Sequence, residues 1–244
     1  MSIERESSGW RCLCSIVYSV LTKLSTADDS DVDLDGKLPG EMSGLRRLRR
    51  LSLKSRNLRD SVGALVMLTS LEFLLVRNTK FSERIPSSID RLSNLKLLEF
   101  NECEMTGTLP SEIGRLSLLD TLHLVRNKLS GSIPVEMMRL EALTSLRIEG
   151  WDSTWHSTMI GPIPTEIKQL VRLQHLSFST YDFASIPSEI GELIELVTLD
   201  LSDSTVDFEL IVSAPRSGTL PSLVQLQKLE ELYLRKSHSM RIRS

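Results

Sequence analysis

The 244-residue chain is predicted to fold as a solenoid, in which short coils of chain stack and share one aliphatic core. Three observations predict this fold. Leucines recur in one register along most of the chain, and two leucines in each copy alternate with outward-facing residues as they do in a β-strand. No single copy is long enough to close a core alone, so stability must come from stacking neighbouring copies.

The repeat is clearest where Leu116, Leu119, Leu122, Leu124, Asn127 and Leu129 follow one another, and the next copy begins 24 residues later at Leu140. Eight copies share this register with small insertions, and the back half of an incomplete copy precedes them at residues 34–42. The eight copies begin at Leu45, Leu68, Leu92, Leu116, Leu140, Leu170, Leu193 and Leu226.

Each part of the repeat has a physical role. The alternating leucines predict a strand that is buried on one side. The asparagine position turns the chain, and its amide can bond backbone groups of the neighbouring coil. The Ile133-Pro134 pair that follows keeps the residue before the proline extended and prevents a helix there. The segment from Ser111 to Leu116 then returns the chain to the next strand.

These features resemble the plant-type leucine-rich repeat, LxxLxxLxLxxNxLxGxIPxxIGxL, over roughly residues 34–236. The second half of that pattern is carried by Ile85-Pro86, Leu109-Pro110, Ile133-Pro134, Ile163-Pro164 and Ile186-Pro187, with Ile113-Gly114 and Ile190-Gly191. The resemblance implies an α/β repeat, a right-handed curved leucine-rich-repeat solenoid with a parallel β-sheet on the concave face that binds proteins or peptides. The pattern is imperfect, because Asn127 alone has asparagine at its position; the other copies carry Arg56, Thr79, Cys103, Trp151, Tyr181 and Ser204.

Three segments are predicted. Residues 1–33 form an N-terminal cap with an amphipathic helix and an acidic segment, residues 34–236 the repeats, and residues 237–244 a basic tail. An apolar stripe from Trp10 to Leu24 at helical spacing favours the helix, and a cleaved signal peptide is the alternative. No Asn-x-Ser/Thr acceptor occurs, which favours a cytoplasmic protein. The chain ends right after the strand expected at residues 232–234, which suggests a shortened product.

Composition excludes several classes of function. A net charge of −3 provides no general attraction to nucleic acid or an anionic membrane, and no segment is long enough to span a bilayer. Cys12, Cys14 and Cys103 cannot form a disulfide framework or a zinc site, and Asp31, Asp33 and Asp35 open a calcium-type loop that lacks its closing glutamate. We therefore expect no metal and no cofactor.

Counting along the repeat predicts which residues face outward from the sheet. Phe73, Leu75 and Leu97 should then lie side by side on a solvated face, which is typical of an interface. A polar rim and two tryptophans of an insertion complete the hypothesis: Arg77, Glu99, His123, Arg126, Arg147, Glu149, Trp151 and Trp155. The alternatives are an unselected surface and tryptophans that pack against the coil edge.

Function is predicted only as a class. Counting along the repeat places Glu99 and Arg147 beside His123 and no nucleophile next to it, and no catalytic motif occurs. An enzyme is therefore not expected. The leading hypothesis is an intracellular adaptor that binds a protein or peptide. The alternatives are a fragment of a receptor-like ectodomain and a repeat protein that inhibits an enzyme.

Overall fold

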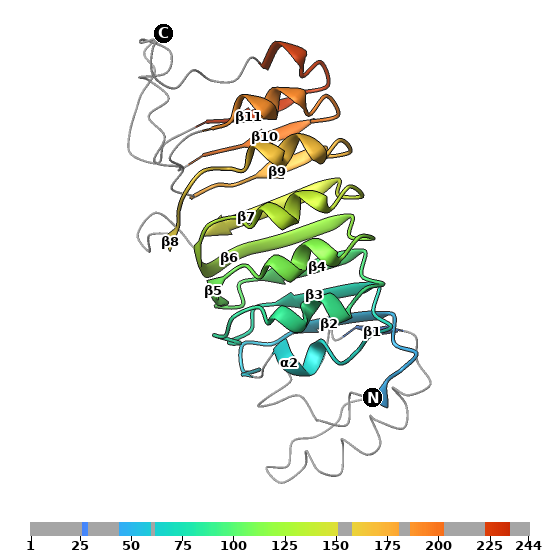
Figure 1. Cartoon of the computed structure of the whole chain (residues 1–244). Coiled ribbons are helices and arrows are strands. Elements are labelled where there is room, and N and C mark those ends of the chain that lie inside the picture. Colours follow the sequence, from blue (N-terminus) through green and yellow to red (C-terminus); the bar gives the residue numbers. More distant parts are fainter. Residues whose placement is uncertain are drawn as a thin grey trace.

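The computed structural model describes residues 26–28, 44–59, 62–150, 158–180, 186–202 and 223–234, and for residues 26–28 and 158 it describes only the backbone. Within these residues the coils stack in a row and each contributes one strand to a continuous sheet (Figure 1). The predicted N-terminal helix, Trp151, Trp155 and the basic tail at residues 237–244 lie outside the described residues.

The main sheet is parallel, and its strand order among the described residues is β1-β2-β3-β4-β6-β7-β9-β10-β11. The strands therefore follow one another in the sheet as they do in the chain, as a solenoid requires. Their bounds are β1 Thr26–Asp28, β2 Arg50–Lys54, β3 Phe73–Arg77, β4 Leu97–Asn101, β6 Thr121–Gly131, β7 Ser145–Gly150, β9 His175–Ser177, β10 Thr198–Asp200 and β11 Glu231–Tyr233.

The leucine pattern identifies the copy that begins at Leu45 as the first one, but the sheet contains one more strand, β1, before it in the chain. Strand β1 pairs with β2, and Thr26 lies opposite Arg50, which is one 24-residue period later. Residues 1–33 were assigned to the cap, so this strand was not expected. Ala27 lies opposite Leu51, and an alanine in place of the leucine conceals the repeat in the sequence.

In six of the coils, among the described residues, the returning side is a short 3₁₀-helix, and these helical turns lie on the opposite side of the coils from the main sheet (Figure 1). In five coils the turn begins directly after a proline, whose ring sets an extended backbone and lacks an N–H to continue a helix. The turns are η2 Ser87–Arg91, η3 Ser111–Arg115, η4 Val135–Arg139, η5 Thr165–Gln169, η6 Ser188–Glu192 and η7 Leu223–Gln225. The coil that begins at Leu45 has no proline at this place and forms a short α-helix, α2, at Val62–Leu65.

The repeated leucines form one core that runs through the stack. Leu98, Leu122 and Leu146 are paired in register in β4, β6 and β7, and all three are fully buried. Each leucine thus contacts its equivalents in the coils on both sides. Full burial of such a side chain stabilises the fold by roughly 1.5–3 kcal/mol, and this term arises only when neighbouring coils stack.

A second, smaller sheet forms where the chain leaves the main one. The C-terminal half of β6 pairs in parallel with β5, Thr106–Thr108, and with β8, Thr158–Met159. Gly131 lies in this half with φ +78°, and a Cβ there would stand 2.8 Å from Cγ2 of Thr108. The close approach and the positive φ together explain the glycine of the repeat.

Asn127 joins two coils through its buried side-chain amide. Its Oδ1 accepts hydrogen bonds from the backbone N–H groups of Cys103 at 3.3 Å and Met105 at 3.1 Å. Its Nδ2 donates to the carbonyl of Phe100 at 2.6 Å and to that of Val125 at 3.2 Å. The predicted role of the asparagine position is therefore confirmed at this residue.

Cys103 supplies the donor half of the same arrangement one coil earlier. Its Sγ–H points to the carbonyl of Val76 at 3.2 Å and to that of Asn101 at 3.3 Å, which correspond to the two carbonyls that Asn127 bonds. Burial raises the pKa of the Cys103 thiol to about 12, so the sulfur keeps the proton that it donates. Cys103 is thus a structural residue of the core.

Asn127→Ala should destabilise the protein by about 2–4 kcal/mol, because each lost hydrogen bond contributes about 1 kcal/mol and two buried N–H groups lose their acceptor. Urea unfolding followed by circular dichroism measures the effect. Asn94→Ala is the matched control, since Asn94 is exposed and donates one bond to the carbonyl of Thr69; we expect a change of about 0.5 kcal/mol or less. Equal losses for the two variants would contradict a special role for Asn127.

Candidate functional site

The strand register places the outward-facing residues in straight columns across the main sheet, and we call this surface the sheet face. The pairing confirms that the residues predicted to face outward at equivalent places of the repeat lie opposite one another. The first column consists of Arg50, Phe73, Leu97, Thr121, Ser145, His175, Thr198 and Glu231, and the second of Ser52, Leu75, Glu99, His123, Arg147, Ser177, Asp200 and Tyr233.

The predicted apolar cluster forms on β3 and β4. Phe73 lies opposite Leu97 in the first column, and Leu75 is two residues further along β3. All three side chains are half-buried rather than fully solvated, and the guanidinium of Arg50 stands 4.3 Å from the centre of the Phe73 ring. The cluster is therefore a partly covered apolar surface, with a cation over one end.

Glu99 differs from its predicted role as a solvated rim charge, because the structure buries it to 5% exposure. Its carboxylate forms a two-point ion pair with the guanidinium of Arg77, through Nε and through Nη2 at 3.0 Å, and accepts a bond from Nδ2 of Asn101 at 2.7 Å. Three hydrogen bonds offset the cost of burying the charge. Arg77 remains exposed, and its guanidinium is held in one place beside the apolar cluster.

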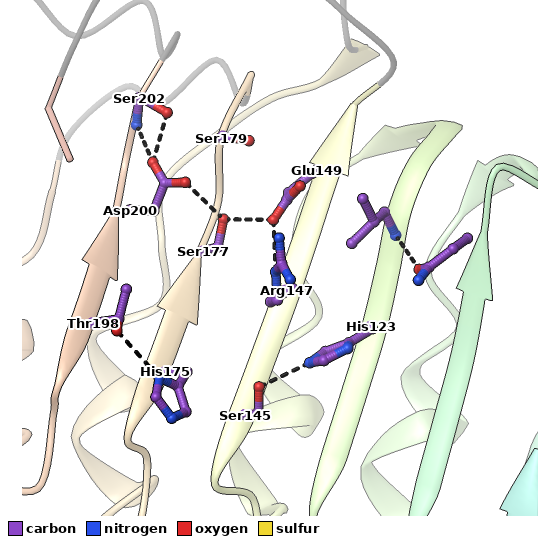
Figure 2. A network of polar contacts seen from close by, with 12 residues as sticks. His123, Ser145, Arg147, Glu149, His175, Ser177, Ser179, Thr198, Asp200 and Ser202 are labelled. Carbon is purple, nitrogen blue, oxygen red and sulfur yellow. Dashed lines mark hydrogen bonds and ion pairs between the residues drawn. The ribbon is translucent and has the colours of Figure 1, made fainter. Parts of the chain in front are cut away.

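A second polar network crosses three strands, β7, β9 and β10, toward the C-terminal end of the sheet face (Figure 2). Glu149 accepts hydrogen bonds from Nε of Arg147 and from the hydroxyl of Ser177, both at 2.9 Å. The same hydroxyl lies 3.4 Å from a carboxylate oxygen of Asp200, and the hydroxyl of Ser202 donates to the other oxygen at 2.6 Å. Two carboxylates therefore lie close together with one arginine, and the network as described is acidic.

The sequence analysis did not identify Ser177, Asp200 and Asn101 as site residues. Ser177 and Asp200 lie in the second column and Asn101 lies opposite Arg77, but nothing in the sequence distinguishes a polar residue that holds a carboxylate from one that faces water. The register provides the signal that was available: Ser177 lies opposite Arg147 in the next strand, two residues from Glu149. Arg126, which was predicted for the rim, bonds Glu102 of the neighbouring coil at 2.6 Å.

His123 has a hydroxyl beside it, which the sequence analysis did not expect. Its Nε2 lies 2.8 Å from Oγ of Ser145 in the next strand. His175 makes a similar contact, Nδ1 to Oγ1 of Thr198 at 3.2 Å, again with the next strand. The histidine–hydroxyl contact thus occurs in two places, each time between neighbouring strands of the sheet. This recurrence is typical of a structural contact between coils rather than of a catalytic pair. No carboxylate is hydrogen-bonded to His123 among the described residues.

Two further searches cover only the part of the chain that the structure describes. It contains no group of three or more His, Cys, Asp or Glu side chains arranged to share a metal ion. It also contains no helix with the length and apolar character needed to cross a membrane.

His123 should titrate below its usual pKa of about 6.5, first because burial disfavours the imidazolium and second because Arg147 is a nearby cation. As the pH falls, the unfolded chain takes up this proton first, so the native state loses stability as the pH drops from about 6.5 toward the lower native pKa. Above about pH 6.5 the neutral imidazole prevails in both states, and this contribution no longer changes with pH. An NMR titration of the imidazole gives the midpoint. Arg147→Gln should raise it, and Arg139→Gln, on the opposite side of the coil, should not; a wild-type midpoint at or above 6.5 would contradict the prediction.

The comparisons with known proteins agree with this geometry. A family model described as a leucine-rich repeat region matches residues 86–242, which is more than half of the chain. None of the curated proteins matches the chain. Among solved structures, a TDR receptor has 28% identity and a TM-score of 0.72, with 89% of this chain covering 40% of that one.

Two further receptor structures are similar. The Arabidopsis receptor kinase HAESA ectodomain, in complex with an N-terminally extended IDA peptide hormone ligand, has 26% identity and a TM-score of 0.70; 86% of this chain covers 34% of that one. The plant peptide hormone receptor RGFR1 in complex with RGF2 has 24% identity and a TM-score of 0.65; 88% of this chain covers 40% of that one. The chain thus spans about 40% or less of the length of these structures. It is a curved solenoid with its parallel sheet on the concave face, and it belongs to the leucine-rich repeat family.

Proposed function

We propose that this chain is a ligand-recognition module that binds an extended peptide across its concave sheet face, as part of a receptor-type ectodomain. The observation that carries this proposal is the half-buried apolar cluster of Phe73, Leu75 and Leu97 beside a fixed ion pair, Arg77–Glu99. Apolar anchors surrounded by polar groups are the arrangement that concentrates binding energy at protein interfaces.

The polar residues suit a ligand that crosses the strands. The carboxylates of Glu149 and Asp200 are already bonded to neighbouring side chains, so they hold their positions before any ligand arrives. A group that is held in this way loses little conformational freedom on binding. A peptide that runs from β3 to β10 would place an apolar side chain on Phe73 and Leu97 and a donor or cation near Glu149.

The receptor-like alternative is preferred to an intracellular adaptor for one reason. The neighbours with 26% and 28% identity are receptors, and one of them is an ectodomain in complex with a peptide hormone. Both are much longer than this chain, so its ligand and its cellular partner are part of the proposal.

Binding can be tested with a peptide selected from a displayed random library on the purified wild-type protein. Phe73→Glu/Leu97→Glu should weaken the selected peptide by about 30-fold or more, since it places two charges on the apolar anchors. The matched control is Leu118→Glu/Ile194→Glu, which places the same charges on two exposed residues outside the sheet face.

Both double variants are first compared by urea unfolding, and Leu97→Ala serves as a milder variant if the glutamates impair folding. We expect the control pair to bind within about twofold of the wild type, because exposed residues away from an interface contribute little. Equal loss in both pairs, or none in either, would contradict a site at Phe73 and Leu97.

The two cellular settings are separated by location. A fluorescently tagged full-length product, expressed in its own cell, should enter the secretory pathway if the chain is part of an ectodomain. The fluorescent protein expressed alone, imaged under the same conditions, shows the distribution of a cytosolic protein. A product that stays with that reference would support the adaptor and contradict the receptor-type reading.

A further inference from the structure

A basic hollow lies outside the sheet face, at the loops that lead into β2, β3 and β4. Its volume is about 650 Å³, and six residues line it: Arg46, Arg47, Arg49, Ser70, Glu72 and Asn94. They come from three successive coils, so the hollow crosses the stack. We propose that this hollow is a binding site for an acidic peptide segment, separate from the site on the sheet face.

The arginines at the hollow are available to a ligand. Arg46, Arg47 and Arg49 are exposed, and the side chains of Arg46 and Arg47 form no hydrogen bond or ion pair with another described residue. A guanidinium offers two parallel N–H donors that fit the two oxygens of a carboxylate. Two such groups on adjacent residues can hold acidic side chains that are close together in a peptide.

The one carboxylate that lines the hollow, that of Glu72, is already ion-paired with neighbouring cations. Glu72 lies between two cations, with Nζ of Lys96 at 2.8 Å and Nη1 of Arg49 at 3.4 Å. Its pKa is lowered, first by the hydrogen bond from Lys96, so it stays ionised and paired. The lining therefore keeps an excess of positive charge, although the chain as a whole has a net charge of −3.

The backbone of the hollow is held by bonds between coils. The hydroxyl of Ser70 donates to the carbonyl of Arg46 at 2.6 Å, and Nδ2 of Asn94 donates to the carbonyl of Thr69 at 3.1 Å. These two bonds join the three coils that line the hollow. The arginines thus project from a fixed surface, which lowers the entropy cost of binding.

A peptide suits the hollow better than a nucleic acid does. None of the six lining residues is aromatic, so no ring is available on which a base could stack. Binding to a nucleic acid backbone also depends on a longer row of cations than two free arginines provide. Short clusters of Asp or Glu match both the charge and the size.

The test uses fluorescent hexaglutamate, with hexalysine and a short single-stranded oligonucleotide as the other probes, in fluorescence polarisation at low and high salt. Wild type should bind hexaglutamate, and Arg46→Gln/Arg47→Gln should weaken this binding by about tenfold or more. Arg139→Gln/Arg172→Gln is the matched control: it removes two exposed arginines of later coils and the same net charge. We expect it to change the affinity by less than about twofold.

A change of opposite sign provides a second readout. Glu72→Gln removes the negative charge from the hollow and should tighten hexaglutamate binding by a few-fold, whereas Glu141→Gln, at an exposed site elsewhere, should have no effect. The proposal is overturned if wild type does not bind hexaglutamate, if the control pair weakens it equally, or if the oligonucleotide binds more tightly through the same arginines. Phe73→Ala/Leu97→Ala, which removes the apolar anchors without changing any charge, should leave hexaglutamate binding unchanged, so failure here is distinct from failure of the sheet-face site.

Discussion

Contact between equivalent leucines in successive coils is the interaction on which the rest of this structure depends. Leu98, Leu122 and Leu146 each have no exposed surface, yet none of their coils contains enough chain to exclude water from them alone. The 24-residue step brings these leucines into register, and hydrogen bonds between adjacent strands then hold that register. Since side chains alternate along a strand, the buried leucines also decide which residues face outward.

This dependence explains how much of the molecule the sequence predicts. Once Leu122 and Leu124 are assigned to the core, the outward places of His123 and of the residues opposite it follow by counting, and the strand pairing confirms them. The count fails where the apolar signal is weak. Ala27 stands where the next coil has Leu51, so strand β1 is missing from the sequence-based fold.

The burial and the polar contacts of individual side chains could not be predicted by counting along the repeat. The position of Glu99 was predicted correctly, but its burial depends on Arg77 and Asn101, which meet it from the adjacent strand and from two residues further along its own. Likewise, the contact between His123 and Ser145 depends on the side-chain conformations of both residues. A repeat pattern specifies the backbone position of a residue and the face of the sheet on which its side chain lies. The residues around that side chain in space decide its conformation and whether its charge is solvated.

The insertions in the repeat show why the sheet face remains one surface. The steps from Leu140 to Leu170 and from Leu193 to Leu226 are longer than 24 residues, yet Ser145 still lies opposite His175 and Thr198 opposite Glu231. The extra residues enter after the strands, where a coil can lengthen without moving its leucines out of register. Variation in coil length therefore falls outside the main sheet, and a ligand that crosses the strands meets an unbroken series of columns from β2 to β11.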